Sequence, residues 1–537
     1  MKRTGWLIAT VALWLCVPAL TQCVPVQPGL AATDAFDALA RRVPADAREV
    51  SFLDLEPQGE AGRHWRRIRG QLEANPAGRE MIHAMYADFQ VEEYGLGDLI
   101  AGPAVKWYDS RSAVHIIAPV NDERATEEAM LHHFGDVQWE QARHGGSLVY
   151  HGRLRESTHR DRLAWTVHDG LLFLAQNYSQ DALPYLEEVL DRAEEDSVAA
   201  LASWQSLRAG LPESPMVLLF YNIPGQAGSS PPPSENTSLS TALSRQPGAI
   251  ACAAVPEAGG VRVEILGAWE LQPDAPPQLH ALFGLPAVDA TAWDGLPANT
   301  AFALIGHDMS LVWSLLDDIL NLDSLVQLSE LIHLDIQGDL ASPDGPLADD
   351  FALALTPPLP AQPIMQDIPA AQLLILAPDA REAQMAEVQA RMADRGAVFG
   401  SREVEGVALQ TQVGTELTGY AISYGLEQSA GFDEGTLLFG TSPNVIAQGA
   451  SARRAGSGLV TRDAFRDALE TLPADPALVA YADAGLVTTL VKANVGDDEY
   501  RQRSDYVLFE AFDAFALGLR FTPDGRVDGT AYLFVGR

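Results

Sequence analysis

The second half of the chain repeats the pattern of the first half, and this repetition limits what the chain can fold into. The stretch RVPADAREVSFLDLE, from Arg42 to Glu56, is a polar loop containing Pro-Ala, followed by a short apolar strand. GLPANTAFALIGHDM, from Gly295 to Met309, has the same form. Two further pairs match downstream in the same order: HIIAPVNDERATEEAM with LILAPDAREAQMAEVQ, and SWQSLRAGLPESPMVLLFY with AFRDALETLPADPALVAYAD.

The spacing between matched positions favours a duplication. It grows steadily, from 253 residues between Val43 and Leu296 to 267 residues between Pro256 and Pro523. Such a drift is expected when one unit is copied and the copies gain small insertions, whereas chance similarities would scatter. With 537 residues, the chain is also too long for a single hydrophobic core. We therefore expect two tandem, pseudo-symmetric repeats.

Each half predicts an α+β domain. A strand that ends in Ala-Pro is followed in both halves by a helix with carboxylates in its first turn, such as Asp122 and Glu123, where the helix dipole favours negative charge. In the second half Met385, Val388 and Met392 share one face of that helix. Because the element order mixes hairpins with helical connections, we expect a largely antiparallel sheet with helices on one face.

The matched segments divide the chain into four parts. Residues 1–32 form a leader or anchor, 43–271 the first repeat, 272–295 a linker, and 296–537 the second repeat. Within the first repeat, Ser, Pro and Gly are frequent in residues 224–247, so we expect a mobile loop there.

The charge balance excludes some partners. The chain has 36 Lys and Arg against 72 Asp and Glu, a net charge of −36. A negative field of this size repels nucleic-acid phosphates and anionic headgroups, so we expect no nucleic-acid partner. The acidic residues are expected to form a solvated surface.

The first residues have the layout of an export signal. Lys2 and Arg3 precede an apolar run from Trp6 to Leu20, which suits a signal peptide better than a full bilayer span. The following Leu20-Thr21-Gln22-Cys23 resembles a lipobox, in which Cys23 would be acylated, although Gln22 replaces the usual small residue. The alternatives are cleavage near Leu30-Ala31-Ala32 and retention of Trp6–Val26 as an anchor. All three predict an exported, extracytoplasmic body, and lipidation or retention of the anchor would tether it to the membrane through its N-terminus.

Three paired motifs recur across both halves. They are a Pro-Ala entry into a strand, a Gly-Asp-Leu run before an apolar strand, and a helix–Leu-Pro–strand unit: Val43–Asp46 and Leu296–Asn299, Gly97–Leu99 and Gly338–Leu340, Leu211–Pro212 and Leu472–Pro473. In these motifs the chain resembles a family of exported bacterial proteins, some described as lipoproteins, known as domain of unknown function 3352. The resemblance spans nearly the whole body. It implies a cell-envelope location and carries no catalytic residues.

No strong catalytic or cofactor motif occurs in the sequence. The chain lacks H-E-x-x-H, paired C-x-x-C, G-x-S-x-G and Walker A patterns, and we expect no catalytic residue and no cofactor. The weak metal candidates are His144, His151, His159 and His168, which could converge from neighbouring strands and turns. Their spacing is irregular, so polar strand faces are the favoured interpretation.

The sequence favours a non-catalytic envelope protein that acts by binding or scaffolding, because the halves match in core-forming positions and share no polar cluster. Two alternatives stay open. One is a carrier or chaperone for an apolar ligand, which would need an internal cavity lined by Leu, Val and Phe. The other is a metal-dependent hydrolase that uses the His144–His168 region.

Overall fold

The computed structural model describes most of the body of the protein. The described residues are 32–54, 59–79, 82, 99–100, 102–108, 113–134, 137–153, 162–177, 180–213, 215–225, 239–320, 333–342, 344–358, 371–413, 421–428, 434–495, 500 and 508–535. The expected leader, with Cys23, and also Asp98 and His159 lie outside them. The chain divides into two compact units, which we call the N-terminal unit (16–227 and 246–270) and the C-terminal unit (228–245 and 271–537).

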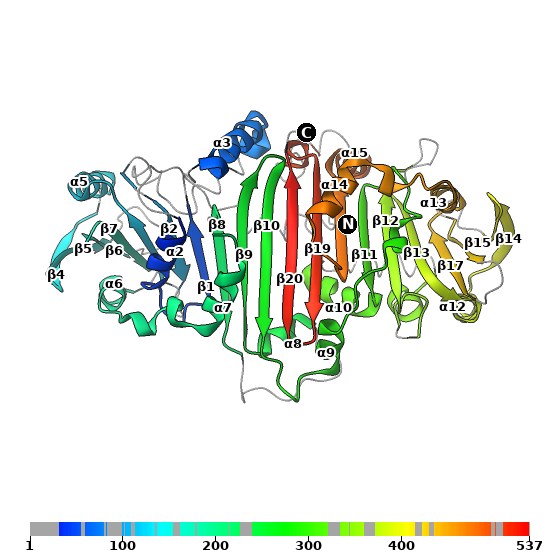
Figure 1. Cartoon of the computed structure of the whole chain (residues 1–537), viewed down its shortest axis with the longest axis horizontal. Coiled ribbons are helices and arrows are strands. Elements are labelled where there is room, and N and C mark those ends of the chain that lie inside the picture. Colours follow the sequence, from blue (N-terminus) through cyan, green and yellow to red (C-terminus); the bar gives the residue numbers. More distant parts are fainter. Residues whose placement is uncertain are drawn as a thin grey trace. The chain divides into compact units, whose positions relative to one another are not determined.

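The N-terminal unit contains an antiparallel sheet in the order β4-β5-β6-β7-β3-β2-β1-β8-β9-β10 (Figure 1). Its strands are β1 (Glu49–Leu53), β2 (Ala104–Tyr108), β3 (Val114–Pro119), β4 (Glu140–His144), β5 (Ser147–Arg153), β6 (Arg162–His168), β7 (Leu171–Asn177), β8 (Val217–Ile223), β9 (Gly248–Glu257) and β10 (Gly260–Trp269). Its helices include α2 (Ala32–Ala40), α3 (Gly59–Ala74), α5 (Glu123–His133), α6 (Leu183–Leu190) and α7 (Ala202–Gly210), with 3-10 turns η2 (Glu194–Asp196) and η3 (Val198–Ala200).

Helices cover both faces of this sheet. On one face, Leu186 of α6 packs in the same buried cluster as Phe173 of β7. The alternate β7 residues Leu172 and Leu174 are buried outside that cluster, on the side where α5 packs against β6 and β7. The expectation of helices on one face was therefore wrong. The reason is visible in the apolar run LLFLA of β7, which is typical of a strand buried on both faces.

The C-terminal unit contains a second antiparallel sheet, in the order β14-β15-β16-β17-β13-β12-β11-β18-β19-β20. The strands are β11 (Phe302–His307), β12 (Asp350–Thr356), β13 (Gln372–Arg381), β14 (Phe399–Val404), β15 (Val407–Gln412), β16 (Ser423–Gln428), β17 (Glu434–Gly440), β18 (Leu478–Asp483), β19 (Ala514–Thr522) and β20 (Arg526–Phe534). The α+β class with a large antiparallel sheet is therefore confirmed.

Helices accompany the second sheet as well. They include α8 (Leu239–Arg245), α9 (Pro277–Phe283), α10 (Met309–Leu320), α12 (Glu382–Asp394), α13 (Pro443–Ala455), α14 (Asp463–Thr471) and α15 (Ala484–Val495), with short turns η4 (Ala290–Trp293), η5 (Ile336–Leu340), η7 (Leu459–Thr461) and η8 (Leu508–Ala511). In α12 the predicted face of Met385, Val388 and Met392 is buried, as expected from its spacing.

Two connecting segments carry more structure than the sequence predicts. Residues 239–245, within the expected loop 224–247, form α8, because Leu239 and Ala242 are buried against α9 and α10 of the C-terminal unit. The expected linker 272–295 contains α9 and η4. Among the helices that the structure describes, none combines the length and the apolar character needed to cross a bilayer.

Candidate functional site

Of the four predicted histidines, the structure describes His144, His151 and His168, and it does not gather these three into one metal site. Nε2 of His144 lies 2.7 Å from Oδ1 of Asp191. Nδ1 of His168 lies 2.9 Å from the Ser147 hydroxyl oxygen. His151 has a separate acidic neighbour, the Glu140 carboxylate, 4.0 Å from Nε2. Within the described ranges, no group of His, Cys, Asp and Glu side chains has a geometry suited to a metal ion.

Cys252 on β9 has little nucleophilic character. Burial raises the pKa of its thiol to about 12, so it is protonated at neutral pH.

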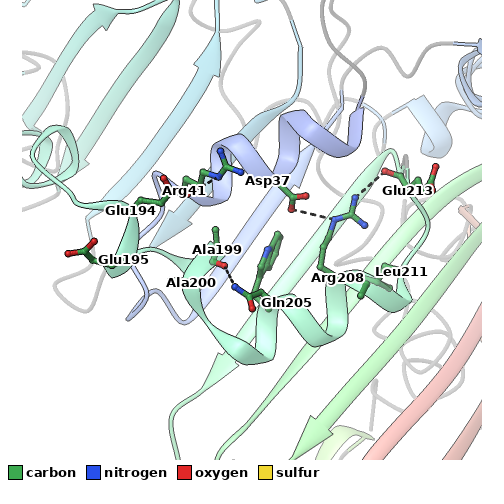
Figure 2. Close-up of a pocket in the computed structure, with 12 residues that line it drawn as sticks. Asp37, Arg41, Glu194, Glu195, Ala199, Ala200, Gln205, Arg208, Leu211 and Glu213 are labelled. Carbon is green, nitrogen blue, oxygen red and sulfur yellow. Dashed lines mark hydrogen bonds and ion pairs between the residues drawn. The ribbon is translucent and has the colours of Figure 1, made fainter.

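A groove lies between α2 and α7 of the N-terminal unit (Figure 2). Its volume is about 830 Å³, which lies within the range of ligand sites, roughly 300–1,000 Å³. Three parts of the chain contribute to its wall, namely α2, the η2–η3 segment and α7 with the turn that follows it. The lining residues are Asp37, Arg41, Glu194, Glu195, Ala199, Ala200, Trp204, Gln205, Arg208, Ala209, Leu211 and Glu213.

Arg208 fixes the α7 side of the groove. Its side chain is only 8% exposed, and its Nη1 and Nη2 atoms donate to the carbonyl oxygens of Pro212 and Glu213, both at 3.1 Å. Its Nε atom lies 3.8 Å from Oδ1 of Asp37 on α2. The buried guanidinium therefore ties two helices and the Leu-Pro turn together (Figure 2).

The opposite end of the groove carries accessible negative charge. Arg41 Nε lies 3.1 Å from Oε1 of Glu194, and both side chains are more than half exposed. Glu195, on the same turn, is also exposed. The groove lining as a whole has four carboxylates and two guanidiniums. Each guanidinium contacts one of these carboxylates, Arg41 with Glu194 and Arg208 with Asp37, and the two remaining carboxylates give the groove a net negative charge.

The floor of the groove is apolar. Trp204 is buried, and its ring meets the ring of Phe220 edge-on, with centroids 5.2 Å apart. Leu211 and the small side chains of Ala199, Ala200 and Ala209 complete this surface. Gln205 holds the wall in place by donating from Nε2 to the Ala199 carbonyl oxygen at 3.0 Å. The groove can thus take a ligand that has both an apolar part and a positive charge.

No motif of the sequence predicts this groove. The helix–Leu-Pro–strand unit near Leu211 indicates only a packing motif. The signals present were the acidic run Glu194-Glu195-Asp196 and the arginine in the last turn of α7. Neither shows that α2 lies beside α7, because that contact joins segments far apart in the sequence.

Comparison with known proteins does not assign the chain. No protein-family model matches it, and no curated protein matches it. Among solved structures, it is similar to the structure of crystal form III of TP0453, with 12% sequence identity and a TM-score of 0.26, over 46% of this chain and 86% of that chain. At these values the likeness shows neither a shared fold nor a shared activity.

Proposed function

We propose that this chain is a non-catalytic binding protein of the cell envelope, which holds a basic, partly apolar segment of a partner in the α2–α7 groove. Export is supported by the positive residues Lys2 and Arg3 and the apolar run that follows them. Tethering would occur through an acylated Cys23 or a retained Trp6–Val26 anchor. The resemblance to exported envelope proteins agrees with this location.

We also propose that the two units arose by duplication. Strand order supports this, since β1 to β10 and β11 to β20 follow the same order within their sheets. The aromatic pair Trp204–Phe220, with centroids 5.2 Å apart at 84°, matches Phe465–Tyr481, with centroids 5.0 Å apart at 86°. Both pairs join the helix before a Leu-Pro turn to the strand that follows the turn. This helix–Leu-Pro–strand unit is one of the motifs that recur in both halves of the sequence.

The observation that carries the binding proposal is the composition of the groove. Four carboxylates surround an apolar floor in a volume of about 830 Å³. A cationic ligand gains attraction from the carboxylates, and its apolar part gains from burial against Trp204 and Leu211. The residues that line the groove include no Ser, Cys, His or Lys, so the lining offers no Ser–His or Cys–His pair. We take this as support for binding over catalysis.

A labelled peptide that alternates arginine and leucine tests the proposal. Its binding to the full chain is measured by fluorescence anisotropy, with a peptide that alternates glutamate and leucine for comparison. We expect the arginine peptide to bind and the Glu194→Gln/Glu195→Gln variant to bind it about tenfold more weakly, since about 1.4 kcal/mol corresponds to tenfold.

The matched control is Glu403→Gln/Glu405→Gln, which removes the same charge from exposed residues of the C-terminal unit. It should bind the arginine peptide as well as the unmodified chain does. Equal weakening in both double variants would show that overall charge, and not the groove, attracts the peptide.

A further inference from the structure

Helix α3 concentrates positive charge in a strongly acidic protein. The chain as a whole has a net charge of −36. In contrast, the sequence of α3, GEAGRHWRRIRGQLEA, contains four arginines and only two glutamates. Each arginine of α3 either contacts other groups of the protein or is exposed to solvent, where it can bind a partner.

The packing of α3 leaves one face of the helix in solvent. Trp65, Ile68 and Leu72 are buried, at 3%, 0% and 2% exposure. Because residues three or four apart share a helix face, this apolar stripe fixes α3 on the unit with the opposite face outward. Arg63 and Arg66 are both exposed on the outward side.

Two of the four arginines are engaged by the protein. Arg67 donates through Nη2 to the Ala258 carbonyl oxygen in the β9–β10 turn. Arg69 forms an ion pair with Glu73, with Nε 2.6 Å from Oε1. Arg63 and Arg66 form no hydrogen bond or ion pair in the part of the chain that the structure describes.

Gly70 leaves open space beside these arginines. It lies one helical turn after Arg66, and no atom lies within 4 Å of the position that a Cβ would occupy. Glycine is an unfavourable choice inside a helix, and here it lets an external group approach the backbone between arginine side chains. The outward side of α3 thus carries two exposed arginines, with open space at Gly70 and with Glu60 as an exposed carboxylate in the first turn.

We propose that this face, which we define as Arg63, Arg66 and Gly70, docks on an anionic phospholipid surface. The inference rests on the proposed envelope location. If the apolar run ends at Val26, five residues, and hence six Cα–Cα steps, separate it from Ala32, where α2 begins. That length spans about 20 Å at most when extended, so the N-terminal unit stays near the bilayer.

Local charge governs this contact despite the acidic body. The Debye length at physiological salt is about 8 Å, so acidic residues on remote surfaces are screened from the lipid phosphates. Each arginine near an anionic membrane surface contributes about a fivefold gain in binding. Guanidinium groups also bind phosphate oxygens through two parallel N–H donors.

Vesicle sedimentation of the full chain tests the proposal. The probes are vesicles of phosphatidylcholine alone and of phosphatidylcholine with one quarter phosphatidylglycerol. We expect preferential binding to the anionic vesicles, and we expect Arg63→Gln/Arg66→Gln to weaken that binding about 25-fold. The leader is present in every sample, so its contribution cancels in the comparison between variants.

The control is Arg48→Gln/Arg143→Gln, which removes two exposed arginines of the same unit. It should leave binding to the anionic vesicles unchanged. Three results would overturn the proposal. They are an equal loss of vesicle binding in both double variants, equal binding to neutral and anionic vesicles, and binding of the chain to soluble polyglutamate in place of vesicles. The arginine–leucine peptide assay on the same variants reports separately on the α2–α7 groove.

Discussion

The ring of Phe465 on α14 lies edge-on to the ring of Tyr481 on β18, with centroids 5.0 Å apart and planes at 86°. Both side chains are fully buried. Trp204 and Phe220 form the corresponding contact in the N-terminal unit, at 5.2 Å and 84°. In each unit this contact attaches the helix before the Leu-Pro turn to a central strand of the sheet.

Removal of the Phe465 ring should strongly destabilise the C-terminal unit. We expect Phe465→Ala to lower the free energy of unfolding by about 3–5 kcal/mol, because it loses apolar burial and leaves a cavity beside Tyr481. Denaturant unfolding measures the change. The half-buried Phe302 on β11 provides the control. We expect Phe302→Ala to lower the free energy of unfolding by less than Phe465→Ala does. Equal losses for both variants would contradict the importance of the buried ring pair.

Asp339 should also be important for stability, through charge. Its carboxylate is 1% exposed and lies between Arg391, with Nε 3.3 Å from Oδ1, and Arg395. Oδ2 also accepts a hydrogen bond from the Asp335 backbone nitrogen at 2.9 Å. We expect Asp339→Asn to lower the free energy of unfolding by about 2–3 kcal/mol, since two guanidiniums lose their shared counter-charge.

The exposed pair Asp524–Arg526, with Oδ2 and Nε 3.1 Å apart, is the control for Asp339. Asp524→Asn should change the free energy of unfolding by less than about 0.5 kcal/mol, because solvent screens exposed pairs. If Asp339→Asn lowers the free energy of unfolding by no more than Asp524→Asn does, burial of Asp339 does not strengthen its ion pairs with Arg391 and Arg395.

The sequence predicts the packing framework well because apolar periodicity records which side chains are buried. Met385, Val388 and Met392 lie on the buried face of α12. Asp122, expected at a helix start, is the N-cap of α5 and accepts a hydrogen bond from the Ala125 nitrogen at 3.0 Å. These features depend on residues only a few positions apart, so a single sequence contains them.

Features that depend on distant residues were missed. The composition of the Ser- and Pro-rich stretch favours a loop. Helix α8 forms there nevertheless, because Leu239 and Ala242 are buried where α8 packs against α9 and α10. The groove needs Asp37 of α2 beside Arg208 of α7, and no local pattern specifies that contact. Likewise, no local pattern shows that the His144 imidazole lies beside the carboxylate of Asp191, 47 residues further along the chain.

His307 should make the stability of the C-terminal unit depend on pH. Its Nδ1 lies 3.0 Å from Oδ1 of Asp350, and this hydrogen bond is the largest effect on the His307 pKa, which it raises above 6.5. Burial opposes the rise, and the negative charges of Asp350, Asp349 and Asp308 add to it. A raised pKa in the folded state means that the stabilisation is complete below about pH 6.5 and is lost as the pH rises through the folded pKa.

Unfolding of the unmodified chain and of His307→Gln at several pH values measures this contribution. We expect the variant to be the less stable of the two at pH 5.5 and the difference to shrink by pH 8.5, by about 1.4 kcal/mol for each unit by which the pKa is raised. NMR titration of the imidazole provides a direct check. A His307 midpoint below 6.5, or a difference that does not change with pH, would contradict the expectation.

Arg208 should determine whether the α2–α7 groove keeps its shape. We expect Arg208→Met to lower the free energy of unfolding by about 2–3 kcal/mol, because the carbonyl oxygens of Pro212 and Glu213 each lose a buried donor. Arg208→Lys should not restore stability, since an ammonium group cannot reach both carbonyls and Asp37 with the geometry of a planar fork. Arg41→Met removes the exposed guanidinium of the same groove and should cost less than about 0.5 kcal/mol. A similar loss for Arg41→Met and Arg208→Met would mean that the buried contacts do not hold α2 and α7 together.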